Sequence, residues 1–145
     1  MAVYEEIVPE EFQVEQYFNQ GTQVVAQVVT DFAPSTTVTY VVKGMDIRNM
    51  SSLLIQLWVK GTVVAAQDVV VQWQRSIDNE HWSNFGVTTF APGSEMEESD
   101  VADNYKSNAT DVAATETAVP YLRFTILPCN SPDAKVTIKF YAVSL

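Results

Sequence analysis

The residue types that could support chemistry gather in one short stretch of this chain, VQWQRSIDNEHW at residues 71–82. Within five positions it holds two acids, an amide, an indole and the only histidine of the sequence. His81 is of the type that serves as a general base. The oxygens of Asp78, Asn79 and Glu80 are hard donors of the kind that Ca²⁺ prefers. The same side chains are also those that a tight turn between two strands requires.

No spacing in the chain matches a motif of catalysis or metal binding. The nucleophile elbow GxSxG, the Walker A loop, GxGxxG, HExxH and the EF-hand loop are all absent. One cysteine, Cys129, and one histidine, His81, exclude both an intrachain disulfide and a zinc site of Cys and His ligands. Neither residues 78–80 nor the acidic run at 95–103 has the alternate-residue spacing of a calcium loop. We therefore expect no catalytic residues, no metal ion and no cofactor.

Two chemical alternatives stay open at this stage. Cys129 would act as a nucleophile only if His81 lay close to it in space, which a sequence does not show. Eighteen acids also make chance carboxylate pairs common, so no pair stands out as a glycosidase couple.

The charge balance argues against several classes of partner. Eighteen acids against eight bases give a formal net charge of -10, which disfavours nucleic-acid backbones and anionic membrane surfaces. No apolar run approaches the roughly 20 residues that cross a bilayer. The first residues lack the basic and apolar regions of a signal peptide. We expect no nucleic-acid or membrane partner, and synthesis in a reducing cytoplasm.

Apolar and polar residues alternate with a period of two, the period of a β-strand, from residue 23 onward. Turn signals separate these segments, and no long stretch has a period of 3.6. We predict an all-β domain over residues 23–145, an antiparallel β-sandwich or jelly roll of about seven to nine strands. The clearest inward faces are Leu53, Ile55, Leu57 and Val59; Val69, Val71 and Trp73; Leu122, Phe124 and Ile126; and Val136, Ile138, Phe140 and Ala142.

Two segments differ from this alternation. Residues 1–22 interleave glutamates with large apolar side chains, and they fit either a packed edge strand or an arm that docks on another chain. Residues 91–118 are long, acidic and poor in large apolar residues, which predicts a solvated loop. The arm would contact a neighbouring chain through Tyr4, Ile7, Val8, Phe12, Tyr17 and Phe18.

Placed between its flanking strands, the stretch 71–82 is better explained as a β-hairpin than as an active site. Asp78 and Asn79 supply the turn, and Asn is second only to Gly in accepting a positive φ. Trp82 then folds back as the returning strand begins.

Residues 41–85 resemble a β module that recurs in bacteriophage structural proteins. The module contains a hairpin of the form V-x-x-x-x-S-x-D-G-x-x-W, which begins here at Val71, and it ends in a strand like 121–124 and an alternating strand like 136–143. The chain departs from the pattern once, with an Asn in place of the Gly. The residues that mark the hairpin are Ser76, Asp78, Asn79 and Trp82.

The resemblance implies a jelly-roll-like virion component. A short chain without a coiled-coil or collagen-like stalk favours a decoration (cement) protein on the capsid surface, which binds the major capsid protein and often forms a homotrimer. The alternative is a carbohydrate- or receptor-binding module of a phage tail or fibre. For that function Trp58, Trp82 or Tyr141 would supply an exposed aromatic platform.

Overall fold

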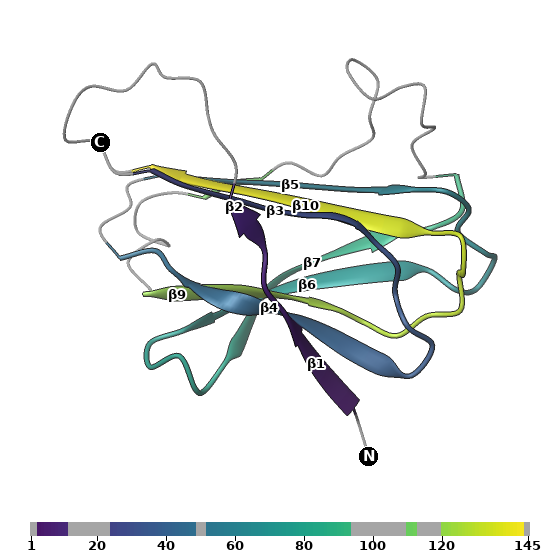
Figure 1. The fold of residues 1–145 in the computed structure, drawn as a ribbon, viewed down its shortest axis with the longest axis horizontal. Coiled ribbons are helices and arrows are strands. Elements are labelled where there is room, and N and C mark those ends of the chain that lie inside the picture. Colours follow the sequence, from purple (N-terminus) through teal and green to yellow (C-terminus); the bar gives the residue numbers. More distant parts are fainter. Residues whose placement is uncertain (1–2, 12–23, 49–51, 94–109, 113–119, 144–145) are drawn as a thin grey trace.

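The computed structural model describes residues 3–11, 24–48, 52–93, 110–112 and 120–143. They form two β-sheets that pack face to face, as Figure 1 shows. The first sheet contains, in spatial order, β1 (Val3–Ile7), β4 (Val38–Asp46), β9 (Tyr121–Ile126), β6 (Val69–Ser76) and β7 (Ser83–Phe90). The second contains β2 (Glu10–Glu11), β3 (Val24–Phe32), β10 (Lys135–Val143), β5 (Ser52–Lys60) and β8 (Thr110–Val112).

The fold confirms the predicted all-β sandwich. Every strand pair in the described part of the chain is antiparallel except β1 with β4, which is parallel. The two shortest strands, β2 and β8, have two and three residues and are too short for a periodic pattern to reveal. The strand β8 lies inside the segment 91–118 and pairs with β5, while residues 94–109 and 113–118 lie outside the described part.

The core lies between the sheets and consists of the faces that alternation predicted. Phe124 of β9 and Phe140 of β10 meet across the sandwich with their rings edge to face, 6.3 Å between centroids. Burying each such side chain stabilises the fold by about 1.5–3 kcal/mol. The side chains that are at most 2% exposed include Ile55, Leu57, Val59, Val69, Val71, Leu122, Phe124, Ile126, Val136, Ile138, Phe140 and Ala142.

Bulges bend three of the strands. In β3 two residues lie between Val29 and Phe32, whereas only one lies between their partners in β10. Asp31, one of the two, has a φ of 51°. In β4 two residues, one of them Gly44, lie between Val42 and Met45, whereas only one lies between their partners in β9. In β7 an extra residue, Phe85, interrupts the register with β6. Such bulges increase the local twist and redirect nearby side chains.

Residues 3–11, which we call the N-terminal strap, take part in both sheets. The strand β1 pairs with β4 of the first sheet, and β2 pairs with β3 of the second, so the strap crosses one side of the sandwich (Figure 1). The side chains of β1 are exposed except that of Ile7, which packs partly buried against the core. The described part of segment 1–22 is thus an edge strand and its continuation.

Candidate functional site

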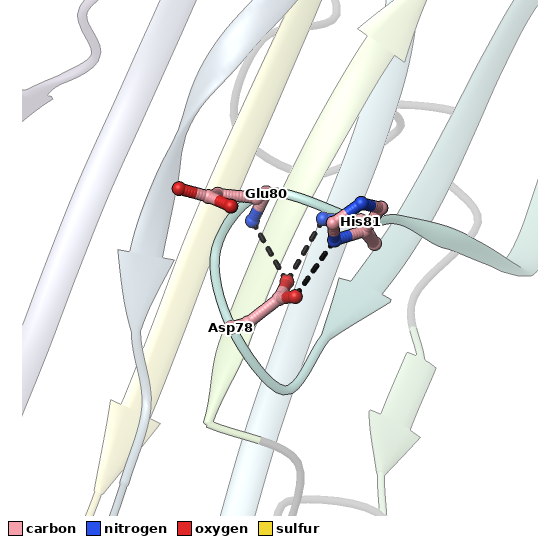
Figure 2. A group of neighbouring side chains, drawn as sticks. All are labelled: Asp78, Glu80 and His81. Atoms are coloured by element: carbon pink, nitrogen blue, oxygen red, sulfur yellow. Dashed lines mark hydrogen bonds and ion pairs between the residues drawn. The ribbon is translucent and has the colours of Figure 1, made fainter.

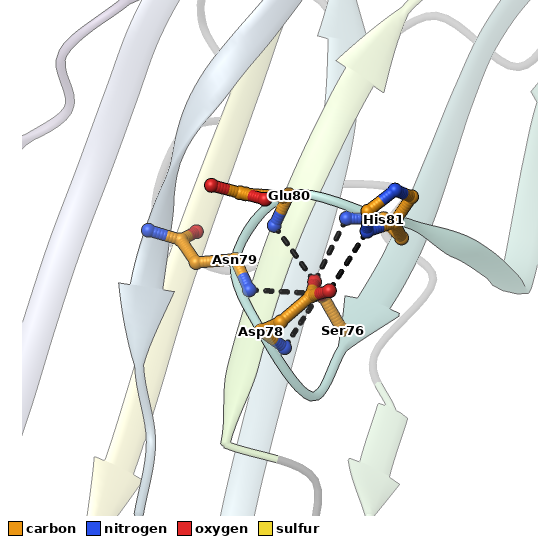
Figure 3. Close-up of polar contacts among 5 residues, drawn as sticks. All are labelled: Ser76, Asp78, Asn79, Glu80 and His81. Carbon is orange, nitrogen blue, oxygen red and sulfur yellow. Dashed lines mark hydrogen bonds and ion pairs between the residues drawn. The ribbon is translucent and has the colours of Figure 1, made fainter.

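The hairpin tip, residues 76–82 between β6 and β7, brings the chemistry-bearing side chains together. Ser76 ends β6 and is 4% exposed. Its Oγ accepts the backbone N–H of Asp78 at 3.2 Å and that of Asn79 at 2.9 Å, and it donates to Oδ1 of Asp78 at 2.9 Å (Figure 3). The hydroxyl therefore closes the first half of the turn.

The Asp78 carboxylate closes the second half. Its Oδ1 accepts the backbone N–H of Glu80 at 2.9 Å and of His81 at 2.8 Å, and its Oδ2 accepts Nδ1 of the His81 ring at 2.7 Å (Figure 2). These bonds hold the pKa of Asp78 well below its ordinary value, first through the backbone N–H and then through the ring of His81, with further contributions from Glu80 and Ser76. The carboxylate is therefore ionised at neutral pH.

Asn79 has the backbone conformation that the sequence predicted. Its φ is 62°, in the left-handed region that Asn accepts more readily than any residue except Gly. The replacement of the module's usual Gly by Asn thus leaves the turn intact.

Trp82 packs the hairpin tip against the outer face of the first sheet. Cζ of Arg123 in β9 lies 4.3 Å from the centre of the indole ring, a cation–π contact. Nε of Arg123 also donates to Oε1 of Gln74 in β6 at 2.8 Å. Burial lowers the pKa of Arg123 from its ordinary value, yet a guanidinium stays charged in proteins. The tip therefore packs on charged and polar groups of the sheet.

Gly44, at the bulge of β4, makes room for this packing. A Cβ at Gly44 would lie 2.7 Å from Oδ1 of Asn79 and 2.9 Å from Cη2 of Trp82. Neither Gly44 nor the contact of Arg123 with Trp82 was predicted from the sequence. A Gly inside a strand of period two is the signal that marks a bulge or a close approach.

Asp78, Glu80 and His81 also form the one group of potential metal ligands found in the described residues. Their ligand atoms lie within 4.8 Å of one another, and all three residues are exposed. Calcium takes six to eight oxygen ligands, whereas two carboxylates are present here and both oxygens of Asp78 already accept bonds that shape the turn. The hydrogen bonds of the turn account for the cluster without a metal ion.

The structure does not bring Cys129 to His81. Leu127, beyond β9, donates its N–H to the carbonyl of Val70, whereas the hairpin tip begins at Ser76, at the other end of β6. The six residue steps of β6 from Val70 to Ser76 separate these ends by about 20 Å. Burial also raises the pKa of the Cys129 thiol, which keeps it protonated at neutral pH. A Cys–His pair is therefore not formed.

The three aromatic residues considered for sugar stacking do not form one platform. Trp82 is half-buried with Arg123 over its ring. Trp58 and Tyr141 are half-buried on the second sheet, four register positions apart on the β5–β10 pair, and Lys139 lies between them. Nζ of Lys139 is 5.5 Å from the centre of the Trp58 ring.

Exposed apolar side chains concentrate on the N-terminal strap. Val3 is 52% exposed, Tyr4 66% and Val8 70%, and these three are half of the large exposed apolar residues in the described chain. Ile7 is half-buried. The remaining residues expected to make contacts, Phe12, Tyr17 and Phe18, lie outside the described residues.

No family model and no curated protein matches the chain. The fold is similar to that of the PBSX exported protein XepA, with a TM-score of 0.55 and 17% identity over 94% of this chain and 44% of that chain. The K3 adhesin domain of Lys-gingipain from Porphyromonas gingivalis is less similar, with a TM-score of 0.45 and 7% identity over 82% of this chain and 72% of that chain. VP2 of infectious bursal disease virus gives a TM-score of 0.43 and 9% identity, over 91% of this chain and 37% of that chain.

At 17% identity the likeness to XepA shows a shared fold, and this chain spans less than half of XepA. The described residues include no helix with the length and apolar character needed to span a membrane.

Proposed function

We propose that this chain is a structural protein of a phage virion. It decorates the capsid as a cement protein, binds the major capsid protein and stabilises the shell without catalysing a reaction. The hairpin of Ser76, Asp78, Asn79 and Trp82 supports the proposal, because its spacing resembles that of the phage module and these residues form the turn that the spacing predicts.

The exposed apolar side chains of the N-terminal strap give the proposal its strongest support. Val3, Tyr4 and Val8 leave a strip of apolar surface in water, and such surface on a soluble protein marks an interaction site. An edge strand such as β1 can also pair through its main chain with an extended segment of a partner. The strap therefore offers both apolar area and backbone groups to a capsid subunit.

The surroundings of the strap suit a docking surface. A hollow of about 350 Å³ lies beside Val8, bordered by Lys43 and Asp46 of β4. A second hollow of about 330 Å³ lies between the strap and β3. Side chains of a partner would fill these hollows, so complementarity would come from shape as well as from area.

The acidic character of the strap indicates the chemistry of its partner. Glu5, Glu6 and Glu10 are exposed around the apolar strip. A capsid surface that is apolar at its centre and basic at its rim would complement this pattern. Many equivalent sites on one particle would then add avidity to a modest affinity at each site.

The alternative function, binding of carbohydrate or a receptor at a phage tail, gains no support from the described aromatic residues. Arg123 lies over the ring of Trp82, and Lys139 separates Trp58 from Tyr141. A stacking platform would need a free aromatic face flanked by polar groups.

Cosedimentation with virus particles that lack the protein tests the proposal. The double variant Tyr4→Ser and Val8→Ser removes two exposed apolar side chains and should weaken binding at least about tenfold, since burying each contributes on the order of 1.5 kcal/mol. Ile77→Ser is the matched control, because Ile77 is an apolar residue of the hairpin tip that is 79% exposed. Undiminished binding by the double variant, or equal loss in the control, would contradict the proposal.

A further inference from the structure

We propose that a slot beside residues 43–46 of β4 takes an extended segment of the major capsid protein as an added strand. The strand β1 pairs with β4 over residues 38–42 of β4 and no further. Val8 and Pro9 follow β1, and the chain turns there toward the second sheet (Figure 1). Proline has no N–H to give to a ladder, so Pro9 cannot continue the pairing. The end of β1 therefore leaves the rest of β4 without a neighbour on that side.

The hollow of about 350 Å³ beside Val8 lies at this edge of β4. Residues 43–46 line it together with Val8, Pro9 and Gln27, and all of these belong to the described part of the chain. Because β1 ends opposite Val42, the hollow occupies the place where the next residues of an edge strand would lie. We call this place the β4 slot.

The backbone of Asp46 points into the β4 slot. The next residue, Ile47, donates its N–H to the carbonyl of Pro120 at 2.7 Å, on the side of β9. Alternate residues of a strand bond to the same neighbour, so the N–H and the carbonyl of Asp46 face the opposite side, where β1 has ended. A strand added in the slot would bond to these groups, as in other cases of recognition by strand addition.

Gln27 of β3 gives a second, independent sign of a missing partner. Its Oε1 is buried and accepts no hydrogen bond. A void of about 10 Å³ beside it has no other polar side chain in its lining, whereas a buried water needs two to four polar partners. Gln27 also borders the β4 slot, so a change of rotamer would present its amide to a donor there. Such a donor would remove the cost of an unpaired buried carbonyl.

The surroundings select an extended segment that is uncharged or basic. Four consecutive residues of one strand border the slot, which suits a chain that rises about 3.3 Å per residue. Glu6 and Glu10 are exposed on the strap, and the net charge is -10, so an acidic segment would be repelled. The inference rests on the proposed function, which supplies the major capsid protein as the owner of this segment.

Hydrogen exchange followed by mass spectrometry tests the slot, on the free protein and on protein bound to virus particles that lack it. Exchange of the Asp46 amide, read from overlapping fragments, should slow at least about tenfold on binding, because ladder bonds protect backbone N–H groups. Protection confined to residues 3–7 would place the partner on the outer edge of β1 and overturn the inference alone. Protection of residues 43–46 that grows with protein concentration in the absence of particles would assign the slot to a second copy and overturn the capsid partner. A protein that does not bind particles would overturn the proposed function and the inference with it.

Gln27→Leu tests the part played by the unpaired amide. The variant should bind particles about two- to tenfold more weakly, while its melting temperature stays equal or rises, because the substitution removes an unpaired buried carbonyl. Gln72→Leu is the matched control, since Gln72 is another half-buried glutamine and lies in β6, away from the slot. It should leave binding unchanged. Undiminished binding by Gln27→Leu, or an equal loss in the control, would overturn the role of Gln27.

Discussion

The guanidinium of Arg123 lies over the indole of Trp82, with Cζ 4.3 Å from the ring centre. Arg123 belongs to β9, the middle strand of the first sheet, and Trp82 precedes the edge strand β7. The contact therefore ties the hairpin tip back across the sheet. The cluster of acids and histidine that suggests an active site in the sequence is held in place by this packing and by the bonds of the turn.

The first prediction concerns this pair. Arg123→Ala and Trp82→Ala should each lower the free energy of unfolding, and a double-mutant cycle should give a coupling of about 0.5–2 kcal/mol, as expected for a partly desolvated cation–π contact. Denaturant unfolding of the four proteins measures it. Strictly additive effects would show that the ring and the guanidinium do not interact.

The second prediction compares two glycines with positive φ. Gly61 has a φ of 86°, and a Cβ there would lie 1.9 Å from the carbonyl oxygen of Asp133. Gly93 has a φ of 91°, and no atom of the described residues lies within 4 Å of such a Cβ. Gly93→Ala should therefore cost only the backbone strain, about 1–2 kcal/mol, whereas Gly61→Ala should cost a further ~1–3 kcal/mol for the displaced backbone. Equal losses in the free energy of unfolding would contradict this account.

The third prediction concerns acid. The pKa of Asp78 in the folded protein lies below its ordinary value because the carboxylate accepts bonds from His81, Glu80 and Ser76. A group with a lowered folded pKa stabilises the fold above its unfolded pKa of about 3.9, and this stability is lost as the pH falls through the folded pKa. The difference in melting temperature between the wild type and Asp78→Asn should thus be largest near neutrality and shrink below about pH 4. A difference that stays constant with pH would refute this role.

The fourth prediction concerns metal ions. Both oxygens of Asp78 are engaged in the turn, so millimolar Ca²⁺ should not raise the melting temperature relative to a chelator control. Ca²⁺ that bound only the folded state would raise the melting temperature, and would raise it further as the Ca²⁺ concentration exceeded the Kd. A rise that disappears in Asp78→Asn would instead identify a calcium site at residues 78–81.

Much of the fold could be predicted from the sequence because each core strand has one inward face. The alternation over residues 55–59, 69–73, 122–126 and 136–142 predicts which side chains are buried, and the structure confirms it. Strands β2 and β8 could not be predicted, because two or three residues hold no period and form only beside a longer strand. The bulges of β3 and β7 depend on tertiary pairing in the same way, whereas Gly44 inside β4 is a sequence signal for the third.

The turn of the candidate site was predictable and its packing was not. Ser76, Asp78 and Asn79 act within four residues of chain, so their spacing alone indicates the geometry. The contact of Trp82 with Arg123 joins residues 41 positions apart, and only the order of strands in the sheet brings them together. The exposure of Tyr4 and Val8 likewise depends on β1 lying at an edge rather than inside a sheet.

Electron microscopy of intact particles tests the central claim most directly. The proposal predicts density for this protein at regularly repeated positions on the outer capsid surface, with the N-terminal strap turned toward the major capsid protein. Density confined to the tail or its tip, with a bare capsid, would contradict the proposal.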